Sequence, residues 1–206
     1  MKCLAFDLGR VLFDFDYNIA LDKIKDRITT SPQKVINALF YEDFGTDFEK
    51  GLVSPKSFFI KFVNEFGADI DYNEFVKIWC EVFWPKNDMI ELVNRLKTVY
   101  EVYLISNINE LHFEYLKENY PYVFSLFKGL VLSFKVKAVK PQIEIYEELK
   151  NMSGCSYDNI VYIDDRSDLI GEAKNFGLNC IKFDNLHQLV NDFRKYDVFV
   201  SNALPR

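Results

Sequence analysis

Residues 2–12 read Lys-Cys-Leu-Ala-Phe-Asp-Leu-Gly-Arg-Val-Leu, a short apolar run that ends at Asp7 and continues into a glycine-containing turn. The pattern predicts a buried strand with one carboxylate at its end. Far along the chain, residues 159–165 read Asn-Ile-Val-Tyr-Ile-Asp-Asp and repeat this arrangement, with Asp164 and Asp165 at the strand end. Parallel α/β sheets bind ligands at the carboxyl ends of their strands, so we expect these acids to share one crevice.

Three carboxylates in one crevice repel one another unless a cation joins them. Hard oxygen ligands of this kind suit Mg²⁺. A carboxylate can also attack phosphorus or carbon and form a covalent intermediate that water later resolves. The two strand ends therefore predict a Mg²⁺ site in which Asp7 is the nucleophile.

The composition is that of a globular protein with a substantial core. The chain has 206 residues, of which 49% are hydrophobic and 17% aromatic, and this argues against disorder. The net charge of −6 (25 basic and 31 acidic residues) argues against nucleic acid or an anionic membrane as a partner. No apolar run has the length of a signal peptide or membrane helix, and oligomeric state cannot be predicted.

The cysteines Cys3, Cys80, Cys155 and Cys180 are scattered and lack the paired spacing of metal ligands. Cys3 and Cys180 lie in apolar, strand-like runs, where we expect reduced and buried thiols. Together with the absence of a targeting segment, this predicts a reduced, cytoplasmic protein.

From residue 86 onward, helical and strand-like segments alternate. Strands are predicted at residues 99–105, 129–133, 160–163 and 179–183, with helices at 88–97, 141–150, 167–176 and 186–194. This alternation predicts a doubly wound, Rossmann-like, mostly parallel sheet. Residues 16–85 carry helical periodicity and proline N-termini instead, so we expect a helical cap inserted into a core formed by residues 1–15 and 86–206.

Two further polar positions follow predicted strands of the core. Ser106 and Asn107 are expected to open a helix, where a hydroxyl and backbone N–H groups can hold a phosphate, although a plain helix cap is an equal alternative. Lys140, just before Pro141, can direct its ammonium at phosphate oxygens or at the aspartate. Lys135 and Lys137 compete with it for that role.

In this order, Asp7-Leu-Gly-Arg-Val, Ser106, Lys140-Pro141 and Ile163-Asp164-Asp165 resemble the four motifs of the haloacid dehalogenase (HAD)-like hydrolase superfamily. The helical insertion lies where that superfamily carries its first-type cap. The run from Asp7 to Asp16, together with residues 48–54 (Phe-Glu-Lys-Gly-Leu-Val-Ser), is similar to a subgroup of small sugar-phosphate phosphatases.

The resemblance implies a Mg²⁺-dependent phosphatase that hydrolyses a small phosphorylated metabolite through an aspartyl-phosphate on Asp7. Ser106 and Lys140 would hold the phosphoryl oxygens, with Asn107 and Arg10 as further candidates for substrate binding. For Arg10, a position on the surface is favoured over a contact with substrate. Mg²⁺ would be bound by Asp7, the Gly9 carbonyl and Asp165, with Asp164 acting directly or through water.

The sequence departs from the family pattern at Gly9, where most phosphatases of this superfamily carry a second aspartate that serves as general acid. Proton transfer of this kind is typically worth about 10²–10⁴-fold in rate. Asp14 or Asp16 is a candidate substitute. Leu169 is a second departure, because many relatives carry asparagine there.

In the cap, Glu49 lies in a segment (residues 48–50) expected to overhang the site or to be exposed at a helix end. His112 and His187 show no evident partners, so no catalytic histidine is predicted. Two other functions remain open: a 2-haloacid dehalogenase, whose halide leaves without a proton, and a catalytically weak protein that binds a phosphorylated ligand.

Overall fold

The computed structural model describes residues 2–41 and 43–200. Within these ranges, five strands form one parallel sheet in the order β5-β4-β1-β6-β7. Their bounds are β1 Cys3–Phe6, β4 Glu101–Ser106, β5 Gly129–Leu132, β6 Ile160–Asp164 and β7 Asn179–Lys182. The doubly wound, Rossmann-like sheet predicted from the sequence is thus confirmed, with strand ends shifted by one or two residues.

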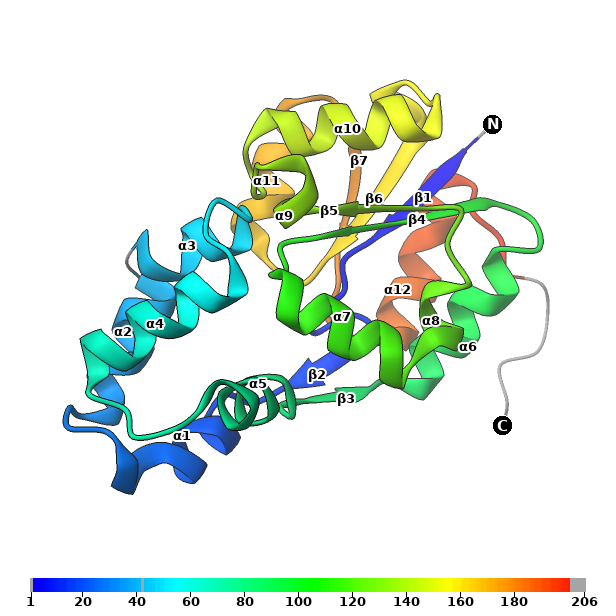
Figure 1. Ribbon diagram of the computed structural model, residues 1–206. Helices are drawn as coiled ribbons and strands as arrows, with labels where there is room; N and C mark the ends of the chain where they lie inside the picture. The colour runs from blue at the N-terminus through cyan, green and yellow to red at the C-terminus, as the bar shows by residue number, and fades with distance from the viewer. Residues whose placement is uncertain (1, 42, 201–206) are drawn as a thin grey trace.

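Helices cover both faces of this sheet (Figure 1). One face packs against α6 (Asn87–Leu96), α7 (Glu110–Asn119), α8 (Pro121–Phe124) and α12 (Leu186–Phe193), and the other against α10 (Ile143–Ser153) and α11 (Ser167–Asn175). Successive strand side chains point to opposite faces, so Leu4 and Phe6 enter the first layer while Cys3 and Ala5 enter the second.

A second group of helices lies to one side of the sheet in Figure 1. It consists of α1 (Asn18–Ile24), α2 (Pro32–Tyr41), α3 (Asp43–Glu49), α4 (Pro55–Phe66) and α5 (Tyr72–Cys80). These helices have an apolar cluster of their own, separate from the two clusters that flank the sheet. Ser54 and Asp71 cap α4 and α5 by accepting hydrogen bonds from the backbone, as serine and aspartate commonly do at helix starts.

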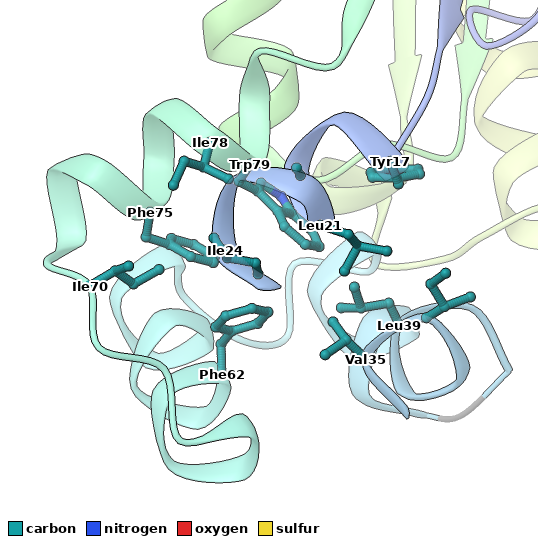
Figure 2. Close-up of a pocket in the computed structure, with 12 residues that line it drawn as sticks. Tyr17, Leu21, Ile24, Val35, Leu39, Phe62, Ile70, Phe75, Ile78 and Trp79 are labelled. Carbon is teal, nitrogen blue, oxygen red and sulfur yellow. The ribbon is translucent and has the colours of Figure 1, made fainter. Parts of the chain in front are cut away.

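The interior of this helical cap is rich in aromatic rings. Phe58 stacks on Phe48 with a centroid distance of 4.1 Å, and Phe75 stacks on Trp79 at 5.6 Å. Figure 2 shows Phe62, Phe75 and Trp79 facing aliphatic side chains of α1 and α2 across a small apolar cavity. The cap therefore holds together through its own hydrophobic core.

The chain passes from the core into the cap and back through two short strands, β2 (Phe13–Phe15) and β3 (Phe83–Pro85), which pair antiparallel. The sequence analysis missed this pair because each strand has only three residues. Four further short elements were not predicted: η1 (Lys25–Arg27) in the cap, and α9 (Ser133–Val136), η2 (Tyr157–Asn159) and η3 (Arg194–Tyr196) in the core. The division into residues 1–15 with 86–206 and residues 16–85 stays a prediction.

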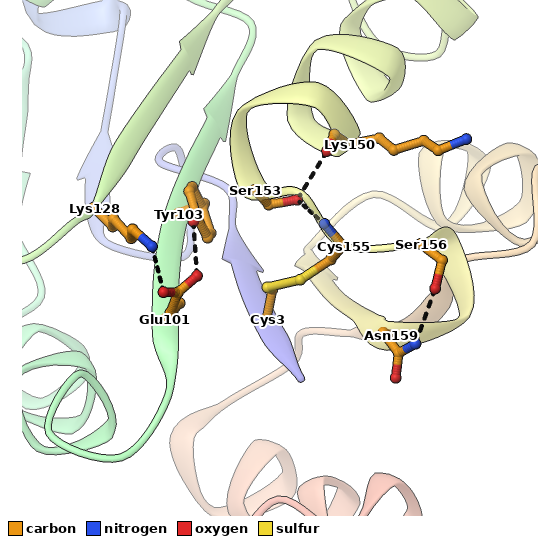
Figure 3. The surroundings of a disulfide bond; sticks show 9 residues. All are labelled: Cys3, Glu101, Tyr103, Lys128, Lys150, Ser153, Cys155, Ser156 and Asn159. Carbon is orange, nitrogen blue, oxygen red and sulfur yellow. Dashed lines mark hydrogen bonds and ion pairs between the residues drawn. A yellow bond between two sulfur atoms is a disulfide. The ribbon is translucent and has the colours of Figure 1, made fainter. Parts of the chain in front are cut away.

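The expected reduced state of Cys3 is wrong. Cys3 and Cys155 form a disulfide that joins β1 to the segment before β6, across a sequence separation of 152 residues (Figure 3). The error arose because sequence spacing does not show that the β1–β6 pairing brings these residues together. Cys180 is a buried free cysteine, as predicted, and so is Cys80. No helix among the described residues is long and apolar enough to cross a membrane.

Candidate active site

The register of the central strands places two of the predicted acids side by side. Phe6 of β1 lies opposite Ile163 of β6, and the Asp7 amide donates to the Ile163 carbonyl at 2.9 Å. Asp7 and Asp164 each follow this pair by one residue, so they leave the same edge of the sheet next to each other. With Asp165, they form a group of carboxylates whose oxygens lie within 4.8 Å of one another.

Lys140 connects the two strand ends. Its Nζ donates to Asp7 Oδ1 and to Asp164 Oδ2, both at 2.7 Å, and to the Ile105 carbonyl at 3.3 Å. The ammonium is buried, which lowers the pKa of Lys140, but the two carboxylates outweigh burial and hold the pKa above its ordinary value. Lys140 is therefore a fixed cation between the acids. The competing lysine Lys137 instead donates to the Gly51 carbonyl.

One ammonium does not balance three carboxylates. Burial, aided by the nearby Asp164, raises the pKa of Asp7 to about 7 although Lys140 opposes this shift. Burial and Asp164 likewise raise the pKa of Asp165. A divalent cation beside these acids would remove the remaining repulsion, so the donor set fits Mg²⁺.

Asp164 differs from the other two acids in its hydrogen bonds. Its Oδ2 accepts from Lys140 and from the Tyr162 hydroxyl, and its Oδ1 accepts from the Arg166 amide at 2.9 Å. Tyr162 was not singled out from the sequence. Its position two residues before Asp164 on a strand places both side chains on one face, and this periodicity is a signal that could have found it.

Ser106 lies at the end of β4 and is buried, with 2% of its surface exposed. The predicted helix does not begin at Ser106: α7 begins at Glu110, where Asn109 caps it by accepting from the His112 amide at 3.0 Å. Asn109 was not considered as a helix cap in the sequence, where only Ser106 and Asn107 were expected to open the helix. Residues 107–109 form a loop between the strand and the helix.

The Asn107 side chain holds the backbone of Lys140. Asn107 Oδ1 accepts from the Lys140 amide at 2.7 Å, and Nδ2 donates to the Lys140 carbonyl at 3.1 Å. This pair of bonds fixes the loop that delivers the ammonium. Asn107 was predicted as a substrate-binding residue, and these contacts add a positioning role.

These residues line a cavity of about 230 Å³ between the core and the cap. The complete lining is Asp7, Leu8, Gly9, Arg10, Phe15, Tyr17, Glu49, Phe83, Ser106, Asn107, Ile108, His112, Lys140, Asp164, Asp165, Arg166 and Leu169. The structure thus brings all eight predicted site residues to one cavity. Their catalytic, substrate-binding and metal-binding roles stay predictions.

Around Gly9, the cavity wall is aromatic. A Cβ at Gly9 would lie 3.1 Å from Cε1 of Phe15, so the Phe15 ring occupies the space that a side chain there would enter. The Arg10 guanidinium lies 4.3 Å from the centre of the same ring, and its Nη1 lies 3.8 Å from Asp14 Oδ1. Arg10 therefore both lines the cavity and covers Phe15, and its side chain is about half exposed.

His112 has partners that the sequence did not reveal. Its Nδ1 lies 3.0 Å from Asn109 Nδ2, its Nε2 lies 3.0 Å from the Trp79 carbonyl, and its ring stacks on Trp79. Burial lowers the pKa of His112 to about 4, so the imidazole is neutral. His112 is thus a buried contact between α7 of the core and α5 of the cap.

No protein-family model matches the chain. Among solved structures, the HAD family enzyme BT-2542 from Bacteroides thetaiotaomicron is similar, with a TM-score of 0.84, 24% identity, and coverage of 94% of this chain and 98% of that one. A further structure of BT-2542 is a complex with magnesium and inorganic phosphate.

Two other solved structures are similar at lower identity. A predicted HAD-like family hydrolase from Porphyromonas gingivalis has a TM-score of 0.80 and 19% identity, over 95% of this chain and 97% of that one. The L-2-haloacid dehalogenase from Xanthobacter autotrophicus has a TM-score of 0.63 and 13% identity, over 96% and 84%. The chain therefore has the fold of HAD family enzymes.

Proposed function

We propose that this protein is a HAD-like hydrolase, a Mg²⁺-dependent phosphatase that acts on a small phosphorylated metabolite, with a sugar phosphate as the favoured class. The observation that carries the proposal is the group formed by Asp7, Asp164 and the partly exposed Asp165, in which the Lys140 ammonium bridges the buried Asp7 and Asp164. Three acids with one cation suit a site that receives a metal. The small cavity suits a metabolite better than a polymer.

Asp7 is the proposed nucleophile because it lies at the centre of this group. One carboxylate oxygen attacks phosphorus, the bond from phosphorus to the leaving oxygen breaks, and an aspartyl-phosphate results. Lys140 orients Asp7 and favours its ionised form against the effect of burial, and its ammonium stabilises charge on the phosphoryl oxygens. The Ser106 hydroxyl, at the end of the adjacent strand β4, donates a hydrogen bond to one of these oxygens.

Asp7 and Asp165 are the proposed carboxylate ligands of Mg²⁺, with the Gly9 carbonyl as a third ligand. Asp164 acts through water, because its oxygens already accept from Lys140, Tyr162 and the Arg166 amide. When bound, Mg²⁺ supplies positive charge that offsets the carboxylates and the transferred phosphoryl group.

The test measures phosphate release from a panel of sugar phosphates, acetyl phosphate and an aryl phosphate, with Mg²⁺ or with EDTA. We expect activity that EDTA abolishes and that Asp7→Asn lowers by about 10³-fold or more, since the nucleophile is lost. Asp14→Asn is the matched control, because Asp14 is an acid on a neighbouring strand that does not line the cavity. We expect it to retain wild-type activity.

A dehalogenase remains the second candidate, since a halide ion leaves without protonation and Gly9 would be no handicap. Release of chloride from 2-chloropropionate that is insensitive to EDTA, without phosphate release, would establish that function instead. Turnover of neither substrate class, combined with tight binding of a phosphorylated ligand, would indicate a binding protein.

A further inference from the structure

A phosphatase of this design needs a proton donor for the leaving oxygen, and Gly9 cannot provide one. The space next to Gly9 is filled by Phe15, so no neighbouring side chain replaces an acid at that point. Protonation matters most when the leaving group is an alkoxide, as in a sugar phosphate. Some other group in the cavity must carry this proton.

Asp14 and Asp16, the substitutes suggested by the sequence, do not line the cavity. Asp14 lies 3.7 Å from the Lys86 ammonium and 3.8 Å from Arg10. Asp16 Oδ1 accepts from the backbone amide and the side chain of Asn18, at the start of α1. Both carboxylates are thus engaged outside the site.

Among the described residues that line the cavity, the carboxylates are Asp7, Glu49, Asp164 and Asp165. Three of these form the metal and nucleophile group, which leaves Glu49.

His112 is not a suitable donor because both ring nitrogens are engaged and burial lowers its pKa. Tyr17 is a poor acid, since burial raises the pKa of its hydroxyl above the ordinary value.

Glu49 is held against the core by its backbone and its neighbours. Its carbonyl accepts from Ser133 Oγ at 2.7 Å, and the same hydroxyl accepts from the Ile108 amide at 2.9 Å. Two residues later, the Gly51 carbonyl accepts from Lys137 Nζ at 2.6 Å. These bonds fix the end of α3 at the cavity, and Figure 1 shows α3 beside α9.

The close approach at Gly51 also requires glycine. Its φ is +62°, and a Cβ there would lie 2.4 Å from the Phe134 carbonyl oxygen. The backbone of the cap therefore meets α9 directly, and the position of the half-buried Glu49 side chain follows from a rigid contact.

The charge environment suits an acid that works near neutrality. Burial raises the pKa of Glu49 to about 7, and Arg166 and Lys140 limit this rise. A pKa near the working pH is the best compromise between protonation and proton donation. The other titratable or charged groups that line the cavity are Asp7, Arg10, Tyr17, His112, Lys140, Asp164, Asp165 and Arg166.

We propose that Glu49, supplied by the cap, is the general acid of this enzyme and the general base of its second step. As the bond from phosphorus to the leaving oxygen breaks, the Glu49 proton passes to that oxygen and the alcohol departs. Water then attacks the aspartyl-phosphate and gives its proton to Glu49, and the bond between phosphorus and Asp7 breaks to release phosphate. This inference rests on the proposed phosphatase function.

The test compares Glu49→Gln with the wild type on an alkyl phosphate, such as a sugar phosphate, and on p-nitrophenyl phosphate. We expect kcat/KM for the alkyl ester to fall by about 10²–10⁴-fold. For the aryl ester it should change little, because nitrophenolate leaves without a proton. Since the base is also lost, a burst of one nitrophenolate per enzyme should precede slow turnover.

Glu65→Gln is the matched control, because it makes the same change from carboxylate to amide at an exposed position on α4, and it should behave as wild type.

The pH profile gives a second readout. Wild-type kcat/KM for the alkyl ester should fall above about pH 7 as Glu49 loses its proton, whereas this limb should be absent in Glu49→Gln. Glu49→Asp keeps an acid one methylene shorter and should retain the limb at a reduced rate. Circular dichroism would verify that each variant is folded.

The outcomes separate this inference from the proposed function. Wild-type phosphatase activity that depends on Asp7 but is unchanged in Glu49→Gln would overturn the role of Glu49 alone. Equal loss of kcat/KM for alkyl and aryl esters would also overturn it, because it would indicate a positional role. Absence of phosphate release by the wild type on every substrate would reject the phosphatase function itself.

Discussion

The core and the cap differ in the kind of side chain that each of them buries. At the carboxyl edge of the sheet, the core concentrates buried charge, with Lys140 between Asp7 and Asp164. The cap buries rings, and Phe58 contacts Phe48, Phe44 and Trp79. The core site depends on strand register, whereas the cap depends on side-chain packing between helices. A substitution in one region should therefore lower the stability of that region and leave the other region largely unchanged.

The largest effect is expected from Phe58→Ala in the cap, because the side chain is 1% exposed and its removal leaves a cavity among rings. Such truncations cost about 3–5 kcal/mol. Hydrogen exchange should show lost protection in α1–α5 and preserved protection in the sheet strands. Ile60→Ala, on the same helix but 56% exposed, is the control and should change stability by less than about 0.5 kcal/mol. Equal loss of protection in the sheet would mean that cap and core unfold together.

A smaller effect is expected from the disulfide, which lies wholly within the core. Opening the Cys3–Cys155 bond releases a loop with a sequence separation of 152 residues, and disulfides of this kind typically contribute about 2–4 kcal/mol. Cys3→Ser should lower the free energy of unfolding by this amount in denaturant titrations. Cys180→Ser, at a buried free thiol of the same layer, is the control. Dithiothreitol should lower its free energy of unfolding by the same amount as it lowers that of the wild type. Identical wild-type stability with and without dithiothreitol would contradict the prediction.

The effect that is smallest at neutral pH, and that develops only in acid, concerns His112, where the two regions meet. Its folded pKa of about 4 lies below the ordinary value of 6.5, so stability is fully present above pH 6.5 and is lost as pH falls toward 4. The slope from this group is about 1.4 kcal/mol per pH unit within that window. His112→Gln should show a shallower decline of unfolding free energy between pH 6.5 and 4 than the wild type. A parallel decline in the two proteins would show that His112 does not titrate in this way.

The sequence predicted the core site better than the contacts of the cap, because the core site depends on strands and the cap on packing between helices. Strand ends are marked by a change from apolar to polar residues, so Asp7, Ser106 and Asp164 could be placed at one edge of the sheet in advance. Because the register sets Phe6 opposite Ile163, the residues that follow them, Asp7 and Asp164, lie close together. The predicted α/β fold is confirmed because it depends on such local patterns.

Long-range contacts were beyond the sequence. The position of Glu49 depends on Ser133, which is 84 residues away, and the disulfide of Cys3 depends on a partner 152 residues away in the same layer. Ser133 is the last residue of a predicted strand and Ser106 directly follows another, so the same rule would have marked Ser133 as a residue at the edge of the site. For Glu49 the sequence left two alternatives open, a position overhanging the site and an exposed helix end, because a charged residue at a helix end is ordinarily exposed.

The bonds that Ser133 and Lys137 make to the cap also bear on the timing of turnover. The Ser133 bond is neutral and adds about 1 kcal/mol net, whereas the Lys137 bond has a charged donor and adds about 1.5–3 kcal/mol, so together they favour the docked arrangement by roughly 10²–10³-fold. An equilibrium of that size leaves about 1% of molecules or fewer undocked at any moment, before packing contributes. Under the proposed function, substrate entry and product exit would use this minority population, and the rate of undocking would set an upper limit on the rate of turnover.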